Sequence, residues 1–242
     1  MTRKTIYKIR RASALTVIIV GILGFLFTSK SNWVYSFNQG SSSDTTIPDN
    51  IEKSDKLASD TLETLEVKGR APKTNYSREK FYKTWPNIDG CNLRQRILKR
   101  EFGDTAITDE KCNVISGTFY EPYTGQIITF ETRKEISDGL QIDHVVALSD
   151  AWQKGAQYMS DDTRYNIATD PLNLIAVDAK TNQKKSDGDA ATWLPPNKSF
   201  RCQYIARQIS VKSKYSLWVT EAEKTSMKTV LETCPEQTVY GI

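Results

Sequence analysis

Histidine is almost absent from this chain, because His144 is the only one among 242 residues. A single imidazole excludes metal sites built from several histidines. It also means that a Ser-His-Asp triad would have to use His144, and no nucleophile elbow accompanies it. Neither a Walker loop nor a dinucleotide-binding fingerprint occurs. These absences weigh against acyl hydrolases and against the two corresponding classes of nucleotide-binding enzyme.

Long apolar runs are also missing, apart from a short one near the N-terminus. Residues 1–11 are basic and contain no acid, and residues 14–27 form an uncharged apolar run. This order is typical of a secretory signal, and the run is shorter than the ~20 residues that span a bilayer comfortably. We expect residues 1–30 to be a signal peptide or an N-terminal membrane anchor attached through residues 14–27. The protein would then be secreted or held at the outer face of the cytoplasmic membrane.

Cysteine is scarce, and none of the four cysteines lies in a Cys-x-x-Cys pair, which argues against a zinc ribbon or knuckle. An even number in an exported chain favours two disulfides. Of the three pairings that four cysteines allow, we expect Cys91–Cys112 and Cys202–Cys234, because these are nearest in sequence. Buried free thiols are the alternative.

The excess of positive charge belongs to the N-terminal segment. The formal net charge is +4, but six Lys and Arg and no acid precede residue 31, so the rest of the chain carries −2. Basicity as a whole therefore gives no argument for a nucleic-acid partner. One local strip does: residues 180–214 contain eight basic side chains and two acids, and such a strip can bind backbone phosphates without reading sequence.

Residues 31–75 are polar, of mixed charge and almost free of aromatic side chains. Such a segment buries too little apolar surface to offset its ordering entropy, so we predict a disordered linker there, with at most a transient helix in "DKLASDTLETLEV". Aromatic residues return at Tyr76, and residues 76–242 are long enough for one core. We assign this part as the globular domain.

Regular patterns within residues 76–242 predict a mixed α+β fold. Asp178 is expected to cap the helix that follows it, and Thr220 with Glu223 forms a capping box. The expected elements are a helix at 91–102, a β-hairpin around "EPYTG", strands at 139–148 and 173–177, a short helix at 151–159, and helices from 179, at 201–215 and at 220–234.

Four polar residues suggest a site: Asp143 and His144 together, then Asn173, then Asn182. Neighbours on one strand point to opposite faces, so Asp143 and His144 can share a site only if the strand ends or bends there. A strand–loop–strand–helix unit would bring Asn182 back over the strand end. Carboxylate and amide oxygens with waters and a phosphate are how Mg²⁺ is usually held, and a neutral imidazole can deprotonate water.

This order of residues resembles the HNH endonucleases of the ββα-metal superfamily. "DPLNLIAVDAKTNQKKSDGD" is similar to the second half of their motif, including the nine-residue step from Asn173 to Asn182. From about Asp89 to Cys234, the chain resembles exported bacterial relatives of the C-terminal nuclease domain of GmrSD restriction enzymes. "SGTFYEPYTG", "IDHVVALSDAWQKGAQ" and "KYSLWVTEAE" carry that similarity.

The resemblance implies a ββα-metal core with an added β-hairpin and flanking helices. It implies His144 as general base, Asp143 and Asn182 as ligands of one divalent cation, and Asn173 as a brace that orients His144 through a hydrogen bond. Asn182 in place of the family's final histidine favours Mg²⁺, with Mn²⁺ as second choice. The long gap from His144 to Asn173 must hold an inserted helix.

Five basic residues are candidates for substrate binding: Arg94, Lys184, Lys185, Arg201 and Arg207. Arg94 would contact a phosphate or pair with a surface acid, and Lys184 and Lys185 would face phosphate or solvent.

The leading interpretation is an exported, metal-dependent endonuclease that hydrolyses DNA or RNA with little sequence specificity. A catalytically inactive surface-binding module is the alternative, and an acyl hydrolase using His144 is a third hypothesis that predicts insensitivity to chelators. The sequence indicates neither strand preference, biological role nor oligomeric state.

Overall fold

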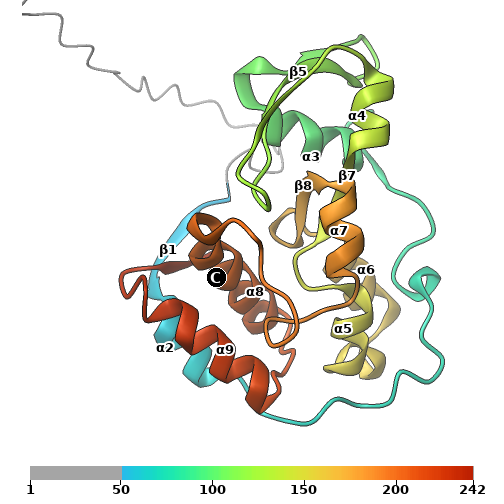
Figure 1. Ribbon diagram of the computed structural model, residues 1–242. Coiled ribbons are helices and arrows are strands. Elements are labelled where there is room, and N and C mark those ends of the chain that lie inside the picture. Colours follow the sequence, from blue (N-terminus) through green and yellow to red (C-terminus); the bar gives the residue numbers. More distant parts are fainter. Residues whose placement is uncertain (1–50, 242) are drawn as a thin grey trace, which may run out of the picture. The chain divides into compact units, whose positions relative to one another are not determined.

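The computed structural model describes residues 51–241, which belong to one unit of the chain (Figure 1). The signal or anchor predicted at residues 1–30 and the first part of the predicted linker lie outside the described residues. Between residues 51 and 241, no helix has the length and apolarity needed to cross a membrane. Strands and helices follow in the order β1 (Lys53–Leu57), α2 (Ala58–Thr64), β2 (Asn87–Ile88), β3 (Cys91–Asn92), α3 (Leu93–Phe102), β4 (Ile107–Thr108), β5 (Val114–Tyr120), β6 (Ile127–Phe130), α4 (Arg133–Gly139), β7 (Leu140–His144), α5 (Leu148–Gln153), α6 (Asp161–Thr169), β8 (Leu174–Asp178), α7 (Ala179–Lys185), α8 (Arg201–Lys214), α9 (Glu221–Leu231) and β9 (Thr238–Tyr240).

The α+β class expected from the sequence is confirmed, and several local predictions are confirmed with it. The hairpin around "EPYTG" is formed by β5 and β6. The Asp178 side chain accepts a hydrogen bond from the Thr181 backbone N–H at the start of α7, and Thr220 and Glu223 form the capping box of α9. These features depend on neighbours in sequence, which is why the sequence alone predicts them.

The predicted disordered linker, residues 31–75, is wrong from residue 53 onward. β1 pairs antiparallel with β9, and α2 packs against α8 and α9. Ala58 and Leu62 are fully buried by this packing. The apolar partner of this amphipathic stretch lies at the far end of the chain, so composition judged locally misses it. The globular domain therefore begins well before residue 76.

A two-stranded antiparallel sheet, β7 with β8, carries the centre of the ββα unit. His144 pairs with Leu174 and Leu140 pairs with Asp178, and α7 packs across both strands. Side chains of β8 alternate between two apolar cores. Leu174 and Ala176 join the core under α3 and the hairpin, while Ile175 and Val177 join the core formed with α8 and α9. This strand pair is thereby fixed from both sides.

Both expected disulfides are present, and the described residues contain no free cysteine. Cys91–Cys112 ties the start of α3 to the loop before β5, and Cys202–Cys234 ties α8 to the end of α9. Each bridge closes a loop between elements of the same core, which restricts the unfolded chain.

The chain between α2 and α3 runs past α5 and α6 before it reaches the hairpin end of the molecule (Figure 1). Backbone and side-chain hydrogen bonds hold it there. The Ala71 N–H donates to the Gln153 carbonyl, the Trp152 indole N–H to the Thr74 carbonyl, and the Arg164 guanidinium to the Lys80 carbonyl. A single 3-10 turn, Arg78–Lys80, lies in this stretch.

Candidate functional site

β7 ends at His144, and this strand end allows two neighbouring side chains to face the same space. Asp143, His144 and Asn182 line one pocket of about 300 Å³. The structure thus brings together three of the four residues singled out from the sequence. The full lining is Lys73, Tyr76, Arg78, Ile142, Asp143, His144, Ala147, Leu148, Ser149, Asn182, Ser186 and Asp187.

The His144 ring is held in one orientation by the end of a helix. Its Nε2 lies 2.9 Å from the carbonyl oxygen of Ala168, in the last turn of α6, where carbonyls have no partner within the helix. Because a carbonyl can only accept, Nε2 carries the proton and Nδ1 of the neutral ring keeps its lone pair. Burial, together with the nearby cation of Arg78, lowers the pKa of His144 to about 3. The imidazole is therefore neutral at physiological pH.

Two aromatic rings complete the surroundings of His144. Trp85 lies parallel to the imidazole at an interplanar angle of 10° and a centroid distance of 5.9 Å, and Tyr82 lies at 5.9 Å. Aromatic faces exclude water from the sides of the ring, which is consistent with its lowered pKa.

The Asp143 carboxylate is buried and has two donors inside the protein. The Tyr123 hydroxyl donates to Oδ2 at 2.5 Å, and the Lys185 ammonium lies 2.9 Å from Oδ1 and 2.8 Å from Oδ2. Lys185 also donates to the His144 carbonyl at 2.8 Å. Burial and the neighbouring carboxylate raise the pKa of Tyr123 well above its usual value, so it remains a donor. The hairpin and α7 together hold Asp143 in place.

One face of α7 aligns the helix with β7. Asn182 donates to the Gln141 side chain at 2.9 Å, and Lys185, one turn further along, meets Asp143. Gln141 and Asp143 are two residues apart on a strand and so share a face. Asn182 and Lys185 are three apart on a helix and so do the same. These two contacts fix the position of α7, and therefore of Asn182, along β7.

Asn173 is fully buried and braces the loop after His144. Its Oδ1 accepts from the Val146 N–H at 2.8 Å, and its Nδ2 donates to the carbonyls of Val146 and Ile167. The expected direct hydrogen bond from Asn173 to His144 is not formed in the described structure, because the Asn173 amide bonds to Val146 and Ile167 and the Ala168 carbonyl bonds to Nε2 of His144. Asn173 instead bonds to Val146, in the loop after His144, and to Ile167, the neighbour of Ala168 in α6.

The oxygen groups of this pocket are compatible with a hard divalent cation. Asp143 presents a carboxylate, and the Asn182 side-chain oxygen takes no hydrogen bond from a described residue. Mg²⁺ is commonly held by one or two such groups, with water and phosphate completing its shell. Residues 51–241 contain no group of three or more His, Cys, Asp or Glu side chains arranged to hold a metal. Lys185 shares the carboxylate, so we expect weak cation binding through few protein ligands.

Two of the five predicted substrate-binding residues are buried, and these two predictions are corrected. Arg207 is 7% exposed and donates to the carbonyls of Pro171, Leu172 and Leu174, so it holds the turn before β8. Lys185 is 2% exposed and belongs to the interior of the site. A basic strip counted along the sequence does not distinguish buried from solvated cations.

The other three lie at separate places. Arg94 is half-buried on α3 and donates to the Leu140 carbonyl at the start of β7, the end opposite His144. Lys184 is exposed on α7. Arg201 donates to the Pro195 carbonyl and lines a different pocket, beside α9. None of the three lines the pocket of His144.

Two residues of the site escaped the sequence interpretation: Arg78, which lines the pocket, and Tyr123, which contacts Asp143 from behind it. Tyr123 lies in the "EPYTG" turn, and its reach to Asp143 depends on Glu121, which accepts from the Asp178 and Tyr123 N–H groups. Arg78 lies just past the predicted linker. The sequence did contain a hint of this role for Arg78, because "YSREKFYKTW" combines basic and aromatic residues.

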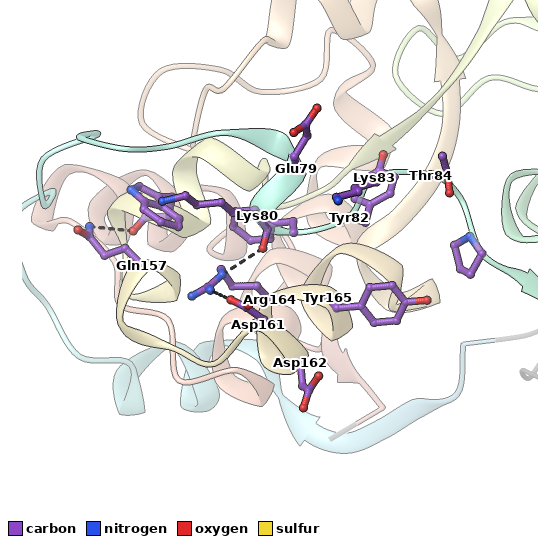
Figure 2. Close-up of a pocket in the computed structure, with 13 residues that line it drawn as sticks. Glu79, Lys80, Tyr82, Lys83, Thr84, Gln157, Asp161, Asp162, Arg164 and Tyr165 are labelled. Atoms are coloured by element: carbon purple, nitrogen blue, oxygen red, sulfur yellow. Dashed lines mark hydrogen bonds and ion pairs between the residues drawn. The ribbon is translucent and has the colours of Figure 1, made fainter.

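A second hollow, of about 850 Å³, is lined mainly by the 79–84 stretch and by α6, and it contains none of the predicted site residues (Figure 2). Arg164 is its most central cation, and Figure 2 shows it tied to Asp161 and to the Lys80 carbonyl. This larger space contains no histidine and none of the residues predicted to act on substrate, so it lacks the converging groups found around His144.

Comparisons with known proteins extend these observations. Residues 93–230 match the family described as GmrSD restriction endonucleases, C-terminal domain. An uncharacterized secreted protein of Arthroderma benhamiae is 39% identical over 190 residues, which cover 77% of this chain and 89% of that protein. No solved structure matches the chain.

Proposed function

The chain belongs to the family of the C-terminal domain of GmrSD restriction endonucleases, and from this premise we propose that it is a metal-dependent endonuclease. Its substrate would be DNA or RNA, cleaved with little sequence specificity. The observation that carries this proposal is the neutral His144, with Nε2 bonded to the Ala168 carbonyl, in one pocket with Asp143 and Asn182.

His144 supplies the base for this chemistry. With the proton fixed on Nε2, Nδ1 is the nitrogen that can take a proton from a water molecule. The resulting hydroxide attacks phosphorus and the bond to the leaving oxygen breaks; the leaving alkoxide takes a proton from solvent water, and the imidazolium returns its proton to solvent. A pKa of about 3 in the free protein makes the base weak, but a phosphate anion beside the ring raises it.

Asp143 and Asn182 would hold the divalent cation, with Mg²⁺ as first choice. When bound, such a cation neutralises charge that develops on the phosphate oxygens. Lys185 and Tyr123 hold the Asp143 carboxylate in a fixed orientation. Asn173 joins the loop after His144 to α6 through its bonds to Val146 and Ile167. The two disulfides, the secreted relative and the basic–apolar N-terminus support export. We propose that the protein is secreted, or held at the outer face of the membrane if residues 14–27 are retained.

The test is nicking of supercoiled plasmid by the full chain, purified with both disulfides formed. Single-stranded DNA and RNA should be assayed in parallel, each with Mg²⁺, with Mn²⁺ and with EDTA. His144→Ala, purified identically, controls for contaminating nucleases. We expect cleavage with metal, none with EDTA, and a loss of about 10²–10⁴-fold in the variant. Equal nicking by wild type and His144→Ala would refute the proposal, and binding without any cleavage would support the surface-binding module.

A further inference from the structure

Three cations surround the pocket of His144, and two of them are already paired. Lys73 lies 2.8 Å from Asp187, and Lys185 lies against Asp143. Arg78 has no carboxylate within ion-pair distance among the described residues, although its side chain is exposed at the pocket wall. Arg78 is thus a cation that lines the pocket of His144 and is free of an internal carboxylate partner in the described structure, so it is available to an anionic ligand.

The Arg78 guanidinium is nevertheless held in position. Its Nε and Nη2 donate to the Tyr82 hydroxyl, and the group lies over the Tyr82 ring with 5.0 Å between Cζ and the ring centroid. Tyr82 in turn packs against His144. Nη1 makes no hydrogen bond to a described residue. An oriented guanidinium with free N–H groups suits a bidentate contact to phosphate oxygens.

The stretch that carries Arg78 is fixed to the rest of the site. Arg164 donates to the Lys80 carbonyl, and the Trp152 indole donates to the Thr74 carbonyl. This stretch precedes residues 93–230, the part that matches the family. The chain therefore adds a wall to the pocket from outside the family's matched region.

We propose that Arg78 binds the phosphate that is cleaved, holding two of its oxygens beside the water that His144 activates. This inference rests on the proposed nuclease function and adds a substrate-contacting residue to it. Lys185 is buried against Asp143 and Arg207 is buried against the turn before β8, whereas Lys73 already has Asp187 as an ion-pair partner at the surface. Under the proposed nuclease function, the anion that Arg78 binds is the phosphodiester attacked by the water that His144 activates.

The test compares three variants of the full chain by plasmid nicking and by kcat and KM on a fluorescent oligonucleotide. Arg78→Met removes the guanidinium, and Arg78→Lys keeps the positive charge but not the paired N–H groups that allow a bidentate contact. Lys83→Met removes the same charge from an exposed neighbour on the other hollow, where Figure 2 shows it. We expect Arg78→Met to lower kcat/KM by about 100-fold or more, Arg78→Lys to be intermediate, and Lys83→Met to stay within about twofold of wild type.

Binding is measured separately in a His144→Ala background. There, Arg78→Met should weaken single-stranded DNA binding and reduce the slope of log affinity against log salt by about 1. If Arg78→Met cleaves and binds as Lys83→Met does, or if Arg78→Lys equals wild type, the inference is wrong while the nuclease proposal stands. If wild type shows no metal-dependent cleavage, the nuclease proposal itself fails.

Discussion

Replacing Lys154 by methionine should destabilise the fold strongly, because its ammonium is the centre of a buried charge cluster. Lys154 is fully buried, and its Nζ lies 2.8 Å from Asp150, 2.8 Å from Asp189 and 2.6 Å from Glu223. Three cations balance three carboxylates in this cluster, so the substitution leaves one uncompensated negative charge. The members are Arg70, Lys154, Lys212, Asp150, Asp189 and Glu223.

Removing one partner of a buried ion pair typically costs about 3–5 kcal/mol. Each carboxylate keeps a second cation in Arg70 or Lys212, so we expect the lower end, about 3 kcal/mol. Asp150 Oδ1 and Glu223 Oε1 lie at ion-pair distance without a well-aligned hydrogen bond, so their attraction is mainly Coulombic. For a domain of this size, 3 kcal/mol lowers Tm by roughly 6–12 °C.

Urea unfolding of the oxidised protein measures this loss, with Lys134→Met as matched control. Lys134 pairs with Asp138, but their side chains are 85% and 64% exposed, so the control should leave the urea midpoint nearly unchanged. A cost below 1 kcal/mol for Lys154→Met would refute the argument that the cluster is desolvated.

The pH dependence gives a second check on the same variant. Burial alone would raise the pKa of Asp189, but Lys154 and Arg70 hold it below its usual value. Stability from this depressed pKa is fully present above about pH 4 and is lost as pH falls toward the folded-state pKa. The variant loses the Lys154 part of that contribution and keeps the Arg70 part, so the difference in unfolding free energy between wild type and variant should narrow as pH falls below about 4. An equal gap at pH 7 and pH 3 would contradict this reasoning.

Three further substitutions test the residues that hold the site. Asn173→Ala should cost about 2–4 kcal/mol in urea unfolding, because three buried backbone groups lose a hydrogen-bond partner, and a cost below 1 kcal/mol would count against the bracing role. Tyr123→Phe should cost about 1–3 kcal/mol and slow cleavage, because it removes the hydroxyl donor to Asp143, whereas Tyr120→Phe on the same hairpin is the exposed control. Arg207→Met should lower Tm without changing KM, and a raised KM at unchanged Tm would restore its predicted contact with substrate.

Local patterns predicted the central part of the site correctly in its topology. The strand predicted at 139–148 is too long, because β7 ends at His144 and α5 begins at Leu148. The Asp178 cap and the helix carrying Asn182 follow from short-range spacing. Contacts of that range depend on the strand period of two and the helix period of about 3.6. Asn173 and Asn182, nine residues apart, are therefore what made His144 a candidate site residue rather than an ordinary buried histidine.

What the sequence could not give depends on contacts between distant segments. The partner of Lys185 is Asp143, 42 residues away, and the partner of β1 is β9, at the opposite end of the described chain. Charge counting placed Arg207 on a solvated strip, although α8 buries it against the turn before β8. Composition likewise assigned residues 53–64 to a linker. Burial of a polar or charged residue is decided by tertiary partners, which no local window contains.

The pairing of β1 with β9 also determines how the domain responds to mechanical load. Lys53 lies opposite Tyr240, so the chain enters and leaves the fold at the same end of this short ladder. Hydrogen bonds of an antiparallel pair run perpendicular to the strands. Tension applied between residues 51 and 241 therefore pulls along these bonds and breaks them one after another, starting at Lys53 and Tyr240. The ladder parts at low force, while α2 still packs against α8 and α9. The pocket of His144 rests on β7 and β8 instead, so pulling reaches it only after the ends have separated.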